Sequence, residues 1–283
     1  MRARAPASSA NLGPGYDVLA VALSLYVEVE VTPAPALSIE SRGEGAEMPL
    51  DGGHLAARVV SEVLGHDRAH ISVSSDVPVG RGLGSSAALA VAAAAAAGAP
   101  DPLALGARFD GHCENAAAAF HGGLVAATLV DGRPLARSLW LDDALRLVLV
   151  VPAQQLPTKA ARSLLPSAVA LDDAVFNLGR LGLLIAGLAD RRALVAQAGD
   201  DRLHQAPRGG QFPESGVLLE ALRRGGATVA CWSGAGPSLL GICDGDEAAS
   251  SARRAAADAM ADVGVKGGAF VVDADRRGLV VSQ

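Results

Sequence analysis

The chain has 283 residues, of which 50% are hydrophobic but only 3% are aromatic, so its core must be built mainly from Ala, Val and Leu. This composition is typical of a globular protein and excludes an intrinsically disordered one. The formal net charge of −6, with a few arginine pairs scattered along the chain, excludes the basic face that nucleic-acid binding requires.

The first half of the chain alternates between predicted strands and short helices. Apolar and polar residues alternate in "LYVEVEVTP" and again in "HISVSSDVP", as expected of half-buried antiparallel strands. The dipeptide Asp131-Gly132 predicts the turn of a hairpin. In chain order we expect strands at 25–33 and 37–44, a helix at 54–64, a strand at 70–78, a helix of about four turns ending at residue 98, helices at 103–109 and 115–123, and a hairpin at 124–135.

The second half opens with "LRLVLVVP", an apolar run that predicts a buried strand at 145–152. After it we expect helices at 158–165, 171–188 and 192–197, a strand, glycine loop and strand over 227–243, a helix at 248–263 and a strand at 268–275. Because many of these strands alternate with period two, the pattern favours an α+β fold with antiparallel sheets over a doubly wound parallel sheet.

Glycine-rich loops carry the chemistry of this sequence. The segment "PVGRGLGSSAA" lies between a predicted strand and a predicted helix, where backbone amides of the helix start can bind phosphate. It lacks the Gly-Lys-Ser/Thr of a Walker A loop and is a poor match to the dinucleotide-binding fingerprint. Taken alone it is equally consistent with an ordinary glycine turn and a serine N-cap. Two further loops, "SSANLGPGYD" and "SGAGPS", favour a common function for all three.

In this order and at these distances, the three loops resemble the motifs of the GHMP kinase superfamily. The segments "FDGHCENAAAAFHGG", "LPTKAAR" and "RLHQAPR" resemble the homoserine kinases in particular. The resemblance covers nearly the whole chain. It implies a two-domain α+β fold: residues 1–140 would form an N-terminal ATP-binding domain with a left-handed βαβ crossover, and residues 141–283 a C-terminal ferredoxin-like domain. ATP would lie between them.

The same resemblance implies ATP and Mg²⁺ as cofactors. Ser86 and Asp110 would be the metal ligands, although the family usually has Glu at the second position. Because Asp is one methylene shorter, either its backbone lies closer to the metal or a water intervenes. His54 stands where many relatives have Asn near the adenine. The ATP-binding residues implied by the resemblance are Pro78, Gly80, Gly82, Leu83, Gly84, Ser85, Ser86, Gly234 and Gly236.

For the second substrate, the resemblance implies an amino acid whose carboxylate is held by Arg162 and Arg208. A planar guanidinium suits this role because it binds a carboxylate through two parallel hydrogen bonds. Glu114 stands where the family more often has Asp, and we interpret it as a group on the substrate side, with general base as the less favoured alternative. The implied substrate-binding residues are Asn11, Asp17, His112, Asn115, Thr158, Arg162, Arg208 and Gly234, and the implied catalytic residues are Glu114, Asn115 and Arg162.

The expected function is ATP-dependent phosphorylation of the side-chain hydroxyl of L-homoserine to O-phospho-L-homoserine, a step of threonine biosynthesis. Two alternatives stay open: a GHMP kinase for a mevalonate-type or sugar alcohol, and a nucleotide-binding relative without turnover. The three cysteines include no C-x-x-C pair, and no apolar run resembles a signal peptide or is long enough to span a bilayer. We therefore expect a cytoplasmic enzyme whose partners are ATP and L-homoserine, with no nucleic acid and no membrane; a homodimer is left open.

Overall fold

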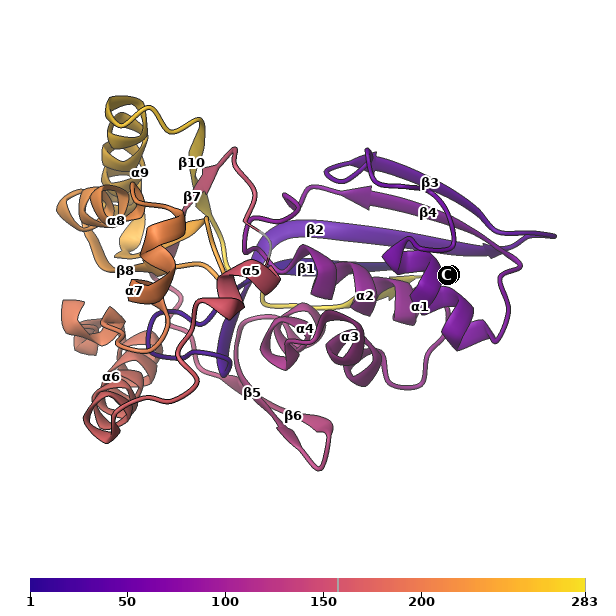
Figure 1. Ribbon diagram of the computed structural model, residues 1–283, viewed down its shortest axis with the longest axis horizontal. Coiled ribbons are helices and arrows are strands. Elements are labelled where there is room, and N and C mark those ends of the chain that lie inside the picture. Colours follow the sequence, from indigo (N-terminus) through magenta and orange to yellow (C-terminus); the bar gives the residue numbers. More distant parts are fainter. Residues whose placement is uncertain (157, 283) are drawn as a thin grey trace.

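The computed structural model describes residues 1–156 and 158–282; the side chains of residues 158–160 also lie outside this description. Two sheets, each covered by helices, form the two ends of the molecule (Figure 1). The larger sheet has seven strands and the smaller has four. Helices and mostly antiparallel strands therefore occur together, and the prediction of an α+β fold is confirmed.

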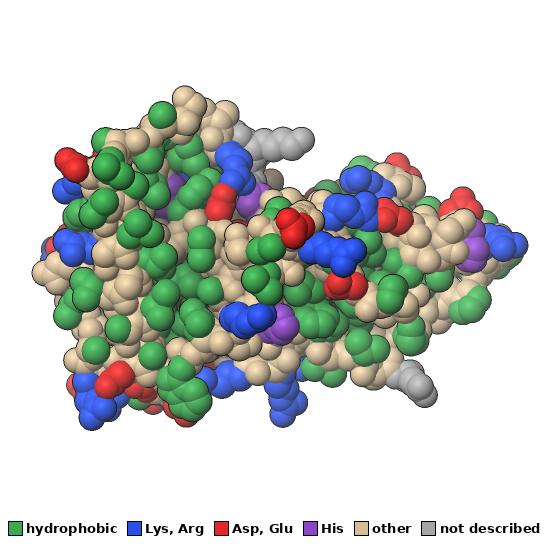
Figure 2. Space-filling model, turned by 90° about the horizontal axis from the view of Figure 1, so that it is seen from below, with side chains coloured by type: hydrophobic (Ala, Val, Ile, Leu, Met, Phe, Trp, Pro, Cys, Tyr) green, Lys and Arg blue, Asp and Glu red, His purple; other side chains and the backbone are tan. Residues whose placement is uncertain are grey.

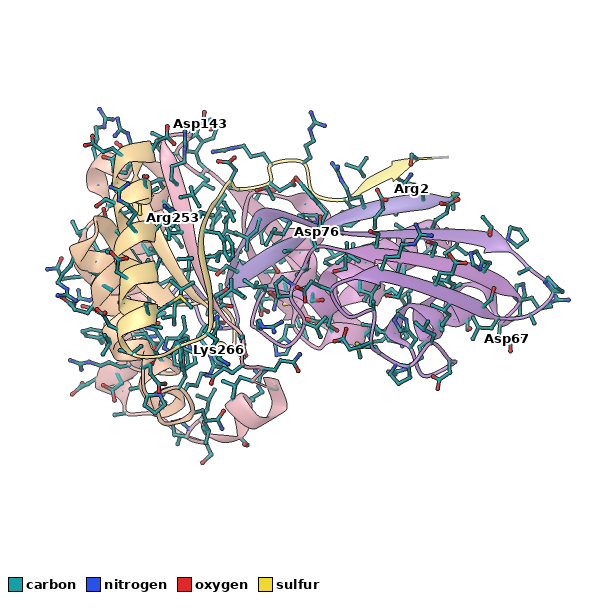
Figure 3. All side chains as sticks on the ribbon, turned by 90° about the horizontal axis from the view of Figure 1, so that it is seen from above. Arg2, Asp67, Asp76, Asp143, Arg253 and Lys266 are labelled. Carbon is teal, nitrogen blue, oxygen red and sulfur yellow. The ribbon has the colours of Figure 1, made fainter. Side chains whose placement is uncertain are left out.

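The larger sheet contains both ends of the described chain. Its strands are β1 (Arg2–Ala10), β2 (Leu19–Pro33), β3 (Ser38–Gly43), β4 (Ala69–Ser75), β5 (Leu124–Val130), β6 (Arg133–Leu139) and β11 (Val280–Ser282). They follow the order β11-β1-β2-β4-β3, and the β5–β6 hairpin joins the first residues of β2. Strands β3 and β4 are parallel, whereas the other described pairs are antiparallel. The last strand thus returns beside Arg2 at the edge of the first sheet, as Figure 3 shows.

Four helices cover one face of the larger sheet (Figure 1). They are α1 (Leu55–Leu64), α2 (Ser85–Ala96), α3 (Pro102–Asp110) and α4 (Cys113–His121). Helix α2 lies in the middle and is buried almost all round, because its side chains beyond the first turn are nearly all alanine. Such small side chains let α2 approach the sheet on one side and its neighbouring helices on the other. A Cβ added to Gly106 of α3 would lie only 2.4 Å from Cγ2 of Val91.

The smaller sheet has the order β10-β7-β9-β8, and each of its pairs is antiparallel. Helices α8 and α9 pack against it (Figure 1). A β-α-β-β-α-β succession in this strand order is ferredoxin-like, as expected. Its elements are β7 (Leu145–Pro152), α8 (Ser215–Arg224), β8 (Ala227–Trp232), β9 (Leu239–Asp244), α9 (Gly245–Asp262) and β10 (Gly267–Val272). Between β7 and α8 the chain forms α5 (Thr158–Ser163), α6 (Leu171–Ala189), α7 (Gln205–Arg208) and three short 3₁₀ helices at Arg191–Ala193, Ala196–Gly199 and Gly209–Gln211.

Some elements differ from the sequence-based predictions. The predicted helix at 192–197 is wrong: two 3₁₀ helices flank Leu194 and Val195, which are extended. Leu194 lies so close to Gly187 that a Cβ there would be 2.6 Å from the Leu194 backbone, which holds the segment against α6. Strand β1 and helix α8 were not predicted. Strand β2 begins at Leu19, whereas the predicted strand began at residue 25. The prediction missed the first part because it is apolar on both faces and shows no alternation.

Charged side chains are dispersed over the surface. On the face seen in Figure 2, Lys and Arg do not gather into one patch. Among the described residues, none of the helices is long and apolar enough to cross a bilayer.

The close packing of α2 and α3 leads to a test of stability. Gly106→Ala should lower the free energy of unfolding by about 1–3 kcal/mol, because the added methyl group collides with Val91. Gly179→Ala in α6 is the matched control, since a Cβ there meets no atom within 4 Å. It should raise stability by about 0.5–1 kcal/mol through the lower helix propensity of glycine. Urea unfolding of both variants checks this; equal shifts would contradict the packing described for α2 and α3.

Candidate active site

The three glycine loops meet where the two sheets adjoin. Ser233 Oγ donates a hydrogen bond to the carbonyl of Gly82 at 2.8 Å, and the amide of Gly234 donates to the carbonyl of Ala10 at 3.0 Å. Asn11 Nδ2 donates to the carbonyl of Gly234 at 2.8 Å. A Cβ on Gly82 would lie 2.2 Å from the Ser233 oxygen, so the approach requires glycine. Both sheets therefore contribute to the walls of one cleft.

That cleft brings together nearly all of the residues that the sequence singled out. Gly236 is not among the lining residues and packs against the Trp232 ring instead. The side chain of Thr158 lies outside the described residues. The predicted residues that line the cleft are Asn11, Asp17, Pro78, Gly80, Gly82, Leu83, Gly84, Ser85, Ser86, Asp110, His112, Glu114, Asn115, Arg162, Arg208 and Gly234.

The loop before α2 is shaped to bind an anion. Gly80, Gly82 and Gly84 all have positive φ, near 70°, 70° and 64°. Gly84 forms the N-cap of α2 without a side-chain hydrogen bond, so the alternative of a serine cap is not supported. No acidic residue lies in the first turn of α2. The amides of Ser85 and Ser86 precede the first helical hydrogen bond, from Ala88 to Gly84, and carry the partial positive charge of the helix start.

Asp110, at the end of α3, turns a buried oxygen toward the same cleft. Its Oδ2 has no hydrogen-bond partner among the described residues, and His112 Nδ1 is 3.5 Å away, too far for a good hydrogen bond. A buried carboxylate oxygen without a partner is costly, which points to a ligand from outside the protein. Carboxylate and hydroxyl oxygens are hard donors that Mg²⁺ accepts, so Asp110 and Ser86 fit this ion. Among the described residues no cluster of three acidic, His or Cys side chains could hold a metal ion.

Two arginines lie at the other end of the cleft. Arg162 on α5 forms an ion pair with Asp17, and its Nη1 is 3.0 Å from Nε2 of His112. Arg208 on α7 is only 3% exposed, and its Nη1 donates to the Gly234 carbonyl at 3.1 Å. Its Nε has no partner among the described residues. Both guanidinium groups lie near the Tyr16 ring, at 5.9 and 5.5 Å from its centroid. A buried cation with an unused donor is suited to bind an anion.

His204 fixes the position of Arg208. Its Nδ1 accepts a hydrogen bond from Arg208 Nη1 at 2.8 Å, and its Nε2 donates to the carbonyl of Gly13 at 2.8 Å. This pattern requires the neutral ring with its proton on Nε2. Burial of the side chain lowers the pKa of His204, which keeps the ring neutral. The i, i+4 spacing of His204 and Arg208 places both on one face of a helical turn, and this spacing is visible in the sequence.

Glu114 lies in the first turn of α4 and is 2% exposed. Its Oε1 accepts from Asn115 Nδ2 at 3.3 Å, and Asn115 Oδ1 accepts from Ser8 Oγ at 2.8 Å. Burial raises the pKa of Glu114 to about 7, although its own backbone amide and the nearby His112 oppose the shift. The carboxyl group is therefore able to hold or release a proton near neutral pH, which is what a general base requires.

Arg81 also lines the cleft and was not singled out from the sequence. Its Nε and Nη2 donate to the carbonyls of Pro152 and Ala153 at 3.0 and 2.9 Å. The sequence signal was its position between Gly80 and Gly82, but the partners lie about 70 residues away and no local pattern indicates them.

The chain matches two protein-family profiles. Residues 53–123 match the N-terminal domain of GHMP kinases and residues 180–262 match their C-terminal domain. The homoserine kinase of Streptomyces coelicolor is 38% identical in an alignment 266 residues long that covers 88% of this chain and 86% of the relative. That of Mycolicibacterium smegmatis is 41% identical in an alignment 262 residues long that covers 83% of this chain and 82% of the relative.

Solved structures agree with these matches. The crystal structure of homoserine kinase from Cytophaga hutchinsonii is 25% identical, has a TM-score of 0.87, and covers 99% of this chain and 96% of its own. The mevalonate kinase of L. major, solved with R-mevalonate, is 14% identical with a TM-score of 0.69, over 98% of this chain and 96% of its own. The second likeness shows a shared fold alone.

The raised pKa of Glu114 makes stability depend on pH. Below about pH 4.5 the carboxyl is protonated in both states; between about 4.5 and 7 only the folded state keeps the proton, so stability falls as pH rises. The wild-type chain should lose about 3 kcal/mol relative to Glu114→Gln over this interval. Urea unfolding at several pH values checks the difference. A constant difference between the two proteins would show that Glu114 is not held protonated by burial.

Proposed function

This chain belongs to the homoserine kinases of the GHMP kinase family, and we propose that its cleft transfers the γ-phosphoryl group of ATP to the side-chain hydroxyl of L-homoserine. The product is O-phospho-L-homoserine, which serves threonine biosynthesis. The observation that carries the assignment of substrate to this cleft is Arg208, a buried cation with an unused Nε donor. It is bonded to Gly234, which itself touches the phosphate loop at Gly82.

The phosphates of ATP would lie on the loop from Gly80 to Ser86, against the start of α2. Beside this loop an apolar pocket opens, and Ser85 and Ser86 line both the pocket and the cleft. Its size and apolar lining suit a purine ring, and the buried His54, the N-cap of α1, is one of its lining residues. Its apolar lining residues are Val27, Met48, Leu55, Val73, Val79 and Leu89.

Ser86 and Asp110 would hold Mg²⁺ between the phosphate loop and the end of α3. The ion, when bound, neutralises charge that develops on the transferred phosphoryl group. The protein's own contribution is the Asp110 oxygen that is buried without a partner among the described residues. The Asp in place of the family's usual Glu keeps the same kind of donor, so the substitution preserves the chemistry of the site.

A zwitterion is the ligand that satisfies the charges at the arginine end. Arg162 and Asp17 now neutralise each other as an ion pair. The α-carboxylate of an amino acid can bind Arg162 and Arg208, while its ammonium group forms an ion pair with Asp17 in place of Arg162. Both members of the ion pair then regain a charged partner, whereas a neutral sugar would bring no anionic group to Arg208.

Within this arrangement Glu114 would accept the proton of the substrate hydroxyl. The hydroxyl oxygen forms a bond to the γ-phosphorus, the bond from phosphorus to the β,γ-bridging oxygen breaks, and ADP leaves. A carboxyl group with a pKa of about 7 is suited to receive this proton near neutral pH. Asn115 orients that carboxyl through its 3.3 Å hydrogen bond and is itself held by Ser8. Positioning and charge stabilisation supply the rest of the rate enhancement.

The charge argument leads to a test with substrate analogues. In the presence of ATP and Mg²⁺ the protein should form ADP with L-homoserine, and much more slowly with mevalonate, galactose or 3-aminopropanol, which lacks the carboxylate. Arg208→Ala should raise the KM for L-homoserine by about 10-fold, as expected for loss of a charge-assisted bond, but leave the KM for 3-aminopropanol unchanged.

A coupled assay for ADP measures these constants. Arg223→Ala is the control, because Arg223 also donates to a backbone carbonyl, that of Ala230, but does not line the cleft. Faster turnover of galactose or mevalonate than of homoserine would refute the proposed substrate. An equal effect of Arg208→Ala on homoserine and 3-aminopropanol would remove Arg208 from the carboxylate site.

A further inference from the structure

Arg81 joins the phosphate loop to the strand that leads toward Arg162. It lies between two glycines of positive φ, and its side chain is 18% exposed. Two of its nitrogens donate to consecutive carbonyls at the end of β7: Nε to Pro152 at 3.0 Å and Nη2 to Ala153 at 2.9 Å. The fork of one guanidinium thus binds two carbonyl oxygens of a segment that belongs to the other sheet.

The backbone around Arg81 strengthens this connection. The amide of Leu156 donates to the carbonyl of Gly80 at 2.9 Å, and a Cβ added to Gly80 would lie 3.5 Å from the Gln155 side chain. On its far side the same segment is held by the amide of Ala153, which donates to the carbonyl of Lys266 at 2.7 Å. Lys266 is labelled in Figure 3 where the chain leaves α9 for β10. Residues 152–156 are therefore fastened between the phosphate loop and the smaller sheet.

This fastened segment precedes the helix that carries Arg162. Helix α5 begins at Thr158, and Arg162 reaches from it to Asp17 and His112 across the cleft. Only residue 157 separates residues 152–156 from α5, so their contacts with the phosphate loop are close along the chain to the helix that carries Arg162. The two substrates would bind at opposite ends of the cleft, and the hydrogen bonds of Arg81 form a physical connection between those ends.

We propose that Arg81 is a positioning residue that couples nucleotide binding on the phosphate loop to the placement of Arg162 at the second substrate. The inference rests on the proposed function. Phosphates that order the loop at Gly80–Ser86 also order Arg81, which then holds the end of β7 and the start of α5 in place. Each substrate consequently tightens the binding of the other, because a coupling free energy acts in both directions.

A direct role for Arg81 as a phosphate ligand fits the contacts less well. Its Nε and one Nη2 hydrogen already serve carbonyl oxygens, and Nη1 faces the carbonyl of Val79 at 3.5 Å and Glu44 Oε2 at 3.8 Å. If the Arg81 guanidinium turned to a phosphate group, it would lose these partners and leave the carbonyls of Pro152 and Ala153 unpaired. The two roles differ in their response to lysine, which keeps the charge but cannot reproduce the two-carbonyl fork.

The test measures homoserine affinity with and without nucleotide. Calorimetry gives the Kd of L-homoserine for the wild type, Arg81→Ala and Arg81→Lys, alone and in the presence of Mg²⁺ with the non-hydrolysable β,γ-imido analogue of ATP. We expect the analogue to tighten homoserine binding by about 10-fold in the wild type, and the ratio to fall toward 1 in both variants. In steady-state assays both variants should raise the KM for homoserine more than the KM for ATP.

Arg146→Ala is the matched control. Arg146 lies at the opposite end of β7, and its Nη1 likewise donates to backbone carbonyls, of Asp143 and Leu145. It should keep the wild-type ratio. In an Arg162→Ala background, Arg81→Ala should cause little further loss of homoserine affinity, because the guanidinium that Arg81 positions is no longer present.

Three results would overturn the inference. A wild-type ratio near 1 would show that no coupling exists. Retention of the ratio in Arg81→Lys would assign the effect to charge rather than to the carbonyl fork. Weaker binding of the analogue alone, with an unchanged ratio, would make Arg81 a phosphate ligand. If the wild type turns over homoserine but the Arg81 variants keep its ratio of Kd values, only the proposed role of Arg81 fails. If homoserine is not a substrate of the wild type, the proposed function fails as well.

Discussion

The backbone contact among three glycine-rich loops is the constraint on which the rest of this structure depends. The loop that begins at Ser233 touches Gly82 on one side and Ala10 on the other through hydrogen bonds of 2.8 and 3.0 Å. Only glycine allows the approach at residue 82, because a Cβ would lie 2.2 Å from a carbonyl oxygen. One loop belongs to the smaller sheet and two belong to the larger, so this contact aligns both sheets around one cleft. Side chains from five helices, α2, α3, α4, α5 and α7, can then converge on it.

The cleft separates charges according to the group that each end would hold. At one end lie the free amides at the start of α2, and the alanines that follow in the same helix let it pack closely against its neighbours. At the other end, Arg162 and Arg208 provide positive charge, which Asp17 and the neutral His204 hold in place. Between them lie two carboxyl groups in different surroundings: Asp110 has a buried oxygen without a hydrogen-bond partner among the described residues, whereas burial raises the pKa of Glu114 to about 7. Environment rather than residue type separates their proposed roles.

Sequence reasoning singled out the residues that line the cleft more completely than it located the helices and strands around it. Glycine loops and the Ser, Asp and Arg residues beside them can be recognised from residue type and spacing alone. Nearly all of the residues chosen in this way line the cleft. Strand β1 was missed because "RARAPASSA" contains no β-branched or aromatic residue, although its first four residues alternate in burial. The helix predicted at 192–197 failed because contact with Gly187 outweighs local propensity. The contacts of Arg81 could not be predicted, since its partners are backbone carbonyls at the end of a strand in the other sheet, and every residue type has such a carbonyl.

The central claim, that the contact of the loops builds both ends of the cleft, is tested most directly by L-homoserine binding without nucleotide in two glycine variants. Gly82→Ala and Gly80→Ala impose similar backbone strain, since both residues have φ near 70°. Only the first brings a Cβ within 2.2 Å of Ser233, whereas the second meets nothing closer than 3.5 Å. Calorimetry should show homoserine binding weakened by about 10-fold or more in Gly82→Ala and far less in Gly80→Ala. Equal effects, or no loss in Gly82→Ala, would contradict this account.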